Sequence, residues 1–95
     1  MKATIELRVL NALGLHARPA SEFVRCALKY KGTSIVLRKD NQTFAATSIL
    51  EVLTAELDQG SVFHAEAEGP DAEAAVQELA ALMVRFRDEE AEESR

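Results

Sequence analysis

A histidine and an arginine stand two positions apart in residues 14–20, Gly-Leu-His-Ala-Arg-Pro-Ala, where an amphipathic helix is expected to begin. His16 would then be the N-cap residue, and the first backbone N–H groups of the helix would point outward without intrahelical partners. These donors and the positive end of the helix dipole form a binding site for phosphate or sulfate. Arg18 adds a planar guanidinium, which suits phosphoryl oxygens better than a lysine ammonium does. The segment therefore predicts an anion site at His16, Ala17 and Arg18.

His16 is also an unusual choice of helix cap. Serine, threonine, aspartate or asparagine is preferred there, and losing such a cap costs about 1 kcal/mol. A positive helix end disfavours the imidazolium form and leaves a neutral imidazole, whose lone pair can act as a nucleophile. Pro19 stiffens the first turn, and Gly14 permits a sharp approach of the chain. These residues predict phosphorylation of His16 itself. The alternative is that His16 is a solvent-exposed cap and Arg18 an ordinary solvated charge.

Hydrophobic periodicity predicts the elements that position this segment. Alternating apolar residues predict strands, and apolar residues at helical spacing predict helices. The expected elements are a strand over 3–10, a helix over 17–29, strands over 33–38 and 42–46, a short helix from Ser48, a strand over 61–67 and a helix after Asp71. This βαββαβα order predicts an α/β fold of the α+β type, an open-faced two-layer β-sandwich. A four-stranded antiparallel sheet would carry three helices on one face.

Length and charge predict one domain with a distinct end. A chain of 95 residues, 47% of them apolar, can build one core, which we place in residues 1–87. Eight of the 11 Lys and Arg residues lie in the first fifty positions, and thirteen of the 16 Asp and Glu residues follow them. Residues 88–95 read Asp-Glu-Glu-Ala-Glu-Glu-Ser-Arg and have no apolar periodicity. They predict a disordered, solvated acidic tail.

Composition disfavours several classes of function. Scattered basic residues and few aromatics argue against nucleic-acid binding, and no apolar stretch approaches the roughly 20 residues of a membrane span. Cys26 is the single cysteine, and no signal segment precedes the first strand, so the sequence predicts a cytoplasmic protein. His64 is expected on a solvent-exposed strand face without metal ligands at suitable spacing. We expect a monomer without metal or cofactor.

The short helix from Ser48 has two features of interest. Ser48-Ile-Leu-Glu51 fits a capping box, which by itself accounts for the serine. The helix also carries more apolar surface than it can bury on a sheet. The residues expected to be partly exposed are Ile49, Leu50 and Leu53. Beside His16, and with Arg18 and Arg25 at its rim, they would form a small surface for transient docking of partner proteins.

Residues 14–20 resemble the active-site signature of HPr, the histidine-containing phosphocarrier family of the bacterial sugar phosphotransferase system. The likeness runs from residue 3 to 86 and includes the element order and the Ser48-Ile-Leu helix start. The resemblance implies that His16 carries the phosphoryl group on Nδ1 and that Arg18 assists its transfer. It implies a carrier, and not a stand-alone enzyme, that receives phosphate from phosphoenolpyruvate-charged enzyme I and passes it to sugar-specific enzyme IIA components.

The same resemblance places Ser48 at a position that a serine kinase modifies in some members of the family. Thr47 and Glu51 depart from a frequently basic residue and a glycine around that serine, which weakens the case for kinase recognition. Two other hypotheses stay open: a regulatory binding module that acts through Ser48 phosphorylation or protein docking, and a plain anion-binding scaffold. The choice between sugar import and the nitrogen-linked branch of the relay is open as well.

Overall fold

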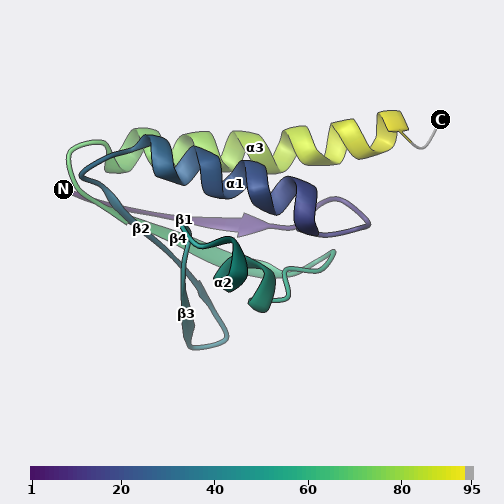
Figure 1. Ribbon diagram of the computed structural model, residues 1–95, viewed down its shortest axis with the longest axis horizontal. Coiled ribbons are helices and arrows are strands. Elements are labelled where there is room, and N and C mark those ends of the chain that lie inside the picture. The colour runs from purple at the N-terminus through teal and green to yellow at the C-terminus, as the bar shows by residue number, and fades with distance from the viewer. Residues whose placement is uncertain (94–95) are drawn as a thin grey trace.

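In this computed structural model, which describes residues 1–93, the elements follow the expected βαββαβα order. They are β1 (Lys2–Arg8), α1 (Ala17–Lys29), β2 (Ser34–Lys39), β3 (Gln42–Ala45), α2 (Ile49–Thr54), β4 (Val62–Glu68) and α3 (Ala72–Glu93). Every strand pairing is antiparallel. Figure 1 shows how these strands and helices are arranged. The predicted α+β open-faced sandwich is therefore confirmed.

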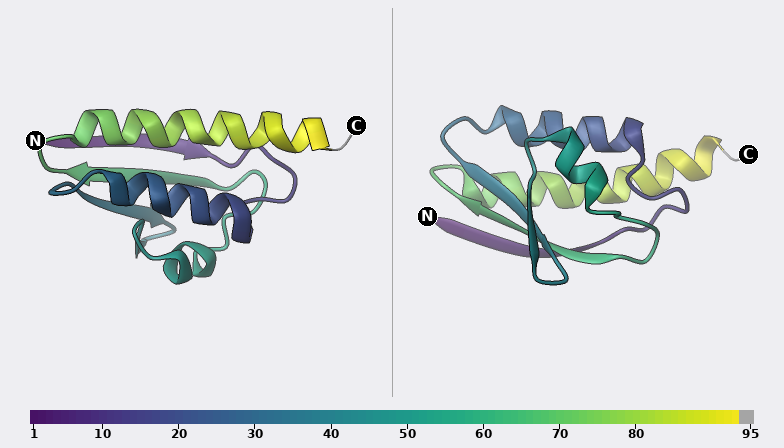
Figure 2. Two further views of the ribbon diagram at one scale, coloured as in Figure 1. Left: turned by 45° about the horizontal axis from the view of Figure 1, so that its top comes forward. Right: turned by 60° about the horizontal axis from the view of Figure 1, so that its bottom comes forward.

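The sheet separates an apolar face from a polar one. Its strand order is β1-β4-β2-β3, with Leu7 opposite Phe63 and Leu37 opposite Ala65 in the register. Side chains alternate along a strand, so Phe63 and Ala65 are buried under the helices, while His64 on the open face is only half-buried. Figure 2 shows α1 and α3 running in opposite directions over the sheet. The helices thus cover only the apolar face.

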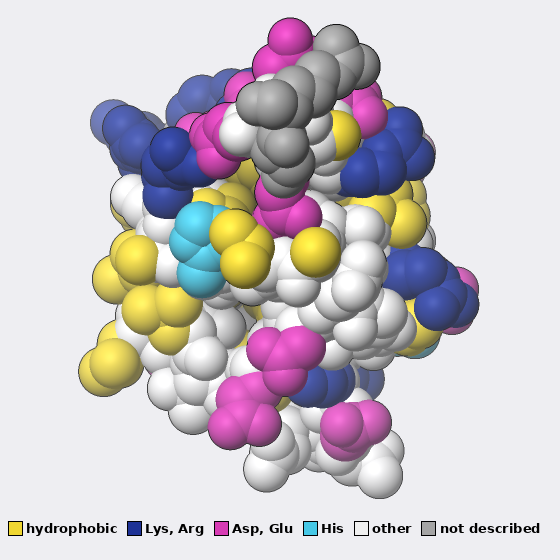
Figure 3. Space-filling view, turned by 90° about the vertical axis from the view of Figure 1, so that its right-hand side faces the viewer, with side chains coloured by type: hydrophobic (Ala, Val, Ile, Leu, Met, Phe, Trp, Pro, Cys, Tyr) yellow, Lys and Arg dark blue, Asp and Glu magenta, His cyan; other side chains and the backbone are white. Residues whose placement is uncertain are grey.

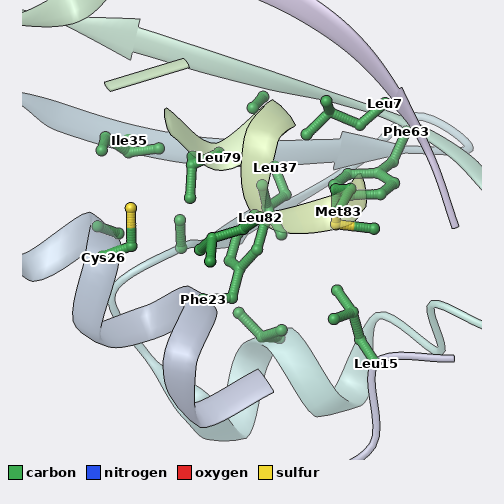
Figure 4. Packing of buried hydrophobic residues seen from close by; sticks show 14 of the residues in the cluster. Leu7, Leu15, Phe23, Cys26, Ile35, Leu37, Phe63, Leu79, Leu82 and Met83 are labelled. Carbon is green, nitrogen blue, oxygen red and sulfur yellow. The ribbon is translucent and has the colours of Figure 1, made fainter. Parts of the chain in front are cut away.

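The core fixes α1 against the sheet. Phe23 from α1 meets Phe63 from β4 with ring centroids 6.4 Å apart and planes tilted by 57°, an arrangement that aromatic pairs favour. Figure 4 shows Phe23 pointing into the cluster formed by Leu37, Phe63, Leu79 and Met83. These side chains are at most 2% exposed. Their packing sets the position of α1, and with it the loop before the helix.

The acidic end of the chain differs from the expectation. Residues 88–93 are not a disordered tail but the last turns of α3, which is helical to Glu93; residues 94 and 95 lie outside the described residues. Glutamate and alanine are good helix formers, so the helix continues where apolar periodicity stops. Two of its glutamates also bind the region around the start of α1. The boundary predicted at residue 87 therefore falls inside a helix.

Candidate functional site

His16 lies at the N-cap of α1. Its backbone is extended, with φ −75° and ψ −174°, and its side chain makes no capping hydrogen bond. Its carbonyl oxygen accepts a hydrogen bond from the Ala20 amide at 2.9 Å and so closes the first turn of the helix. The side chain is exposed to solvent. The imidazole thus stands at the positive end of α1 and is free to meet a ligand.

The loop before α1 is fixed by backbone contacts. Asn11 is buried, and its Nδ2 donates a hydrogen bond to the Gly14 carbonyl at 2.8 Å. Gly14 has a φ of +70°, and a Cβ at this position would lie 2.6 Å from the Leu57 carbonyl oxygen. The Leu15 amide donates to that same oxygen at 2.9 Å. Only glycine allows this close approach, which sets the direction in which the chain enters α1.

Arg18 points from the first turn of α1 to the end of α3. Its Nη2 donates hydrogen bonds to both carboxylate oxygens of Glu93, at 2.6 and 2.9 Å. Both side chains remain largely exposed, at 66% for Arg18 and 53% for Glu93. Sequence reasoning placed Arg18 beside His16 but missed Glu93. The arginine is therefore already engaged by an anion that belongs to the protein itself.

Glu90, about one turn before Glu93 in α3, binds the loop before α1. Its carboxylate accepts hydrogen bonds from the Ala12 amide at 2.5 Å, the Leu13 amide at 3.0 Å and Asn11 Nδ2 at 3.2 Å. Burial opposes the charge on Glu90. The hydrogen bonds from these three groups, together with the proximity of His16, outweigh it and hold the pKa of the Glu90 carboxyl below its usual value. Glu90 thereby fastens the end of α3 to the loop that carries His16.

Three residues of α3 share the face turned to this loop. Phe86, Glu90 and Glu93 follow at i, i+4 and i+7, a spacing that places them on one face of the helix but does not indicate which loop that face meets. They line a small hollow together with His16 and Arg18. Figure 3 shows a histidine with basic, acidic and hydrophobic side chains gathered on this side of the molecule. The site thus joins the positive end of α1 to the acidic end of α3.

The comparisons with known proteins agree with this geometry. Residues 3–85 match the PTS-HPr family model, described as the PTS HPr component phosphorylation site. The chain belongs to the HPr family. A phosphocarrier protein HPr of Borreliella burgdorferi is 39% identical over 75 residues, which make up 79% of this chain and 86% of that protein. The resemblance drawn from residues 14–20 is therefore confirmed.

Two solved HPr structures illustrate the range of the likeness. The crystal structure of a phosphocarrier protein HPr from Bacillus anthracis has a TM-score of 0.80 and 34% identity, covering 85% of this chain and 95% of that one. The solution structure of Crh, the Bacillus subtilis catabolite repression HPr, has a TM-score of 0.69 and 30% identity, covering 87% of this chain and 95% of that one. The HPr fold therefore spans a phosphocarrier and a protein named for catabolite repression.

Ser48 caps α2, but only half of the predicted capping box forms. Its Oγ accepts a hydrogen bond from the Glu51 amide at 3.3 Å. The prediction of a reciprocal bond from the Ser48 amide to the Glu51 carboxylate is wrong. The Glu51 carboxylate accepts from the Ala45 amide at 3.0 Å, and the Ser48 amide donates to the Ala45 carbonyl at 3.2 Å. Glu51 therefore ties α2 to the end of β3. Ser48 is half-buried, and the regulatory role suggested by the HPr resemblance stays a prediction.

The apolar residues predicted to be exposed on α2 are exposed. Ile49, Leu50 and Leu53 show 41%, 73% and 40% of their surface, and we call these three residues the apolar patch. Leu13, in the loop before α1, is 67% exposed and lines the hollow beside His16. Sequence reasoning missed Leu13 because it stood in a turn without periodicity. An HPr-family carrier thus presents apolar surface on α2 and in the loop that leads to His16.

The other residues considered from the sequence lie apart from this site. Cys26 is buried, and burial, followed by the hydrogen bond and charge of Glu78, raises the pKa of its thiol to about 11. His64 Nε2 lies 3.7 Å from a carboxylate oxygen of Glu6 on the open face of the sheet. Within residues 1–93, no three possible metal-binding side chains cluster together. In that same range, no helix has the length and apolar character needed to cross a bilayer.

Proposed function

We propose that this HPr-family protein accepts a phosphoryl group on His16 from phosphorylated enzyme I and passes it to enzyme IIA components of the sugar phosphotransferase system. The observation that carries the proposal is an exposed histidine at the N-cap of α1 whose side chain makes no capping hydrogen bond. Arg18 follows it two residues later. The match of residues 3–85 to the HPr phosphorylation-site model supports it. In this proposal the protein acts as a cytoplasmic, monomeric carrier that is consumed and regenerated in each transfer.

The transfer needs position and charge from the carrier. Nδ1 of His16 attacks the phosphorus in line while the bond from phosphorus to the donor atom of enzyme I breaks, and that donor atom keeps the electron pair. The Nδ1 lone pair is available when the ring proton resides on Nε2. The amides of Ala17 and Arg18 and the Arg18 guanidinium then balance the charge of the phosphoryl oxygens. Transfer to enzyme IIA repeats the step with His16 as the leaving group.

The apolar patch is the proposed docking surface. Its three residues stay exposed on α2, although neighbouring Val52 is fully buried. A carrier must leave one partner before it meets the next, so a small interface serves it better than a large one. Leu13 and Arg18 lie on the loop and helix start that deliver His16, and we assign them to the rim of the same surface.

The test is a phosphorylation assay. Incubation with phosphoenolpyruvate and the enzyme I of the same organism should add one acid-labile phosphoryl group to the wild-type protein. His16→Ala should abolish the added mass, whereas His64→Ala should keep it because His64 lies on the open face of the sheet. Phosphorylation that survives His16→Ala would refute the assignment. Binding of sulfate without any transfer would favour the plain anion-binding scaffold.

A second candidate is regulation through Ser48. The likeness to Crh, named as a catabolite repression HPr, supports it, as does the position of Ser48 at the start of the helix that carries the apolar patch. A phosphate on Ser48 would stand next to the Glu51 amide, which suits an anion, and near the Glu51 carboxylate, which repels one. Modification there would change the charge of the docking surface without touching His16. A serine kinase is the partner that this candidate requires.

A further inference from the structure

The carboxylate of Glu93 is paired with the Arg18 guanidinium, which a phosphoryl group on His16 would also need. Arg18 Nη2 donates to both oxygens of Glu93, at 2.6 and 2.9 Å. In the proposed function, the same guanidinium balances the charge of a phosphoryl group on His16. Carboxylates and phosphoryl groups bind a guanidinium through the same N–H donors, so the two anions compete for Arg18.

Glu93 is brought to Arg18 by a firmly seated helix. The last turns of α3 reach past the start of α1, as Figures 1 and 2 show. Phe86 is buried in the core, and Glu90 is hydrogen-bonded to the loop before α1. Because both residues lie on the face that carries Glu93, they hold this face against the phosphorylation site. The pair with Arg18 is therefore supported by two anchors earlier in the helix.

The contact can also open. The two side chains are 66% and 53% exposed, and an exposed ion pair is weak and screened by salt. A phosphoryl group carries more negative charge and more acceptor oxygens than a carboxylate. On His16 it would attract Arg18 and repel the Glu93 carboxylate. Phosphorylation therefore favours the state in which Glu93 has left the arginine.

We propose that Glu93 competes with the phosphoryl group for Arg18. Its carboxylate pairs with Arg18 in the unphosphorylated protein and is released when His16 is phosphorylated. This inference rests on the proposed function. The closed state slows the first transfer because the donor meets an arginine that is already paired. The release of Glu93 from Arg18 exposes the acidic last turn of α3 only in the phosphorylated protein.

Rates with a small phosphoryl donor test the competition without a partner protein. Phosphoramidate transfers its phosphoryl group to a histidine nitrogen: its P–N bond breaks, a new P–N bond to His16 forms, and the leaving nitrogen takes up a proton as ammonia. Glu93→Gln should raise this rate about twofold to fivefold at low ionic strength, the range given by an exposed ion pair. The gain should shrink in high salt.

The matched control is Glu92→Gln. It removes the same charge from the same turn, and the ion pairs found within residues 1–93 include none to Glu92. Its rate should stay at the wild-type value. In an Arg18→Ala background, Glu93→Gln should have no further effect, because the group for which Glu93 competes is gone.

Amide NMR provides the second measurement. Phosphorylation of the wild-type protein should shift the signals of residues 91–93 and speed their hydrogen exchange, whereas Glu93→Gln should show much of this change before phosphorylation. Equal rates for Glu93→Gln and Glu92→Gln, or unmoved signals at 91–93, would overturn the competition and leave phosphorylation of His16 standing. Absence of phosphohistidine in every variant, with phosphoramidate and with enzyme I, would overturn the proposed function and this inference together.

Discussion

Leu13 and Glu90 lie 77 positions apart in the chain, yet the Leu13 amide donates a hydrogen bond to Glu90 Oε2 at 3.0 Å. The neighbouring Ala12 amide binds the other oxygen of the same carboxylate. Two successive amides of the loop that delivers His16 are thus satisfied by the last part of α3. The acidic last part of α3 is therefore a structural part of the proposed phosphorylation site at His16.

Glu90→Gln should loosen this loop. The variant loses the charge that two backbone amides and Asn11 face, so hydrogen exchange at Ala12 and Leu13 should become faster and the Tm should fall. Glu89→Gln is the control, since Glu89 pairs only with exposed Arg85 one turn away on the same helix, among the contacts found in residues 1–93. Unchanged exchange at both amides would contradict the role of Glu90.

The same variant should alter the pH dependence of stability. The pKa of Glu90 is lower in the folded protein than its ordinary value of 4.5. Its contribution is therefore fully present above the unfolded-state pKa and is lost as the pH falls through the lower folded-state pKa. We expect the Tm difference between wild type and Glu90→Gln to be constant near neutral pH and to shrink in acid below the unfolded-state value. A difference that grows in acid would contradict this sign.

Gly14→Ala should be more destabilising than Gly32→Ala. Both glycines have positive φ values, +70° and +81°, so each substitution costs about 1–2 kcal/mol in backbone energy. At Gly14, the new Cβ would also lie 2.6 Å from the Leu57 carbonyl oxygen, while nothing lies within 4 Å at Gly32. Denaturant unfolding of the two variants isolates the contact from the backbone effect. Equal losses of unfolding free energy would show that the close approach carries no weight.

Cys26 should be slow to react in the folded protein. Burial and the nearby Glu78 raise the pKa of the thiol from 9.0 to about 11. Two pKa units lower the thiolate fraction about 100-fold at pH 8, and burial limits access further. Alkylation by iodoacetamide, followed by mass spectrometry, should be at least that much slower in buffer than in denaturant. Similar rates in both solutions would refute the buried, protonated thiol.

Leu50→Ser should separate docking from chemistry. Leu50 is 73% exposed, so the free energy of unfolding should change by no more than about 0.5 kcal/mol. Loss of an apolar docking contact should reduce transfer from enzyme I about fivefold or more at low carrier concentration, while the phosphoramidate rate stays the same. Leu28→Ser, at an α1 position that is 53% exposed and outside the apolar patch, should affect neither rate. Equal behaviour of the two variants toward enzyme I would remove Leu50 from the docking surface.

Substitutions at Ser48 distinguish its capping role from a regulatory one. Ser48→Ala should cost about 1 kcal/mol, because the Glu51 amide loses its acceptor. Ser48→Asp keeps a good cap and adds a charge, so it should preserve stability. Under the regulatory candidate, it should lower transfer from enzyme I and leave the phosphoramidate rate unchanged. An unaltered rate with enzyme I would leave Ser48 as a cap only.

Strong periodicity made most of the fold predictable. The helix expected over 17–29 is the observed α1, because one continuous apolar stripe marks both of its ends. The placement of His16 and Arg18 at the start of that helix followed directly. The exposed apolar residues of α2 were predicted as well, since a helix of this length has only one face to bury.

Contacts between distant segments were beyond such reasoning. No local signal links Glu90 or Glu93 to the loop before α1, because charged residues are equally common on solvated helix faces. Similarly, Glu51 fits a capping box by spacing, but the tertiary position of β3 offers it the Ala45 amide instead. The type of the turn between β2 and β3 is not predictable from its residues either, because the turn contains no glycine. Asp40 and Asn41 both adopt positive φ there, at 51° and 67°, as a type I′ turn requires.

The start of β1 and the end of α3 at Glu93 lie at opposite sides of the molecule, as Figure 1 shows, and α3 ends beside Arg18. An affinity tag, fluorophore or surface tether attached at the end of α3 would lie next to His16 and Arg18 and would crowd incoming proteins. The same addition before Met1 would emerge far from these two residues. Assays of this protein should therefore be built on N-terminal attachments.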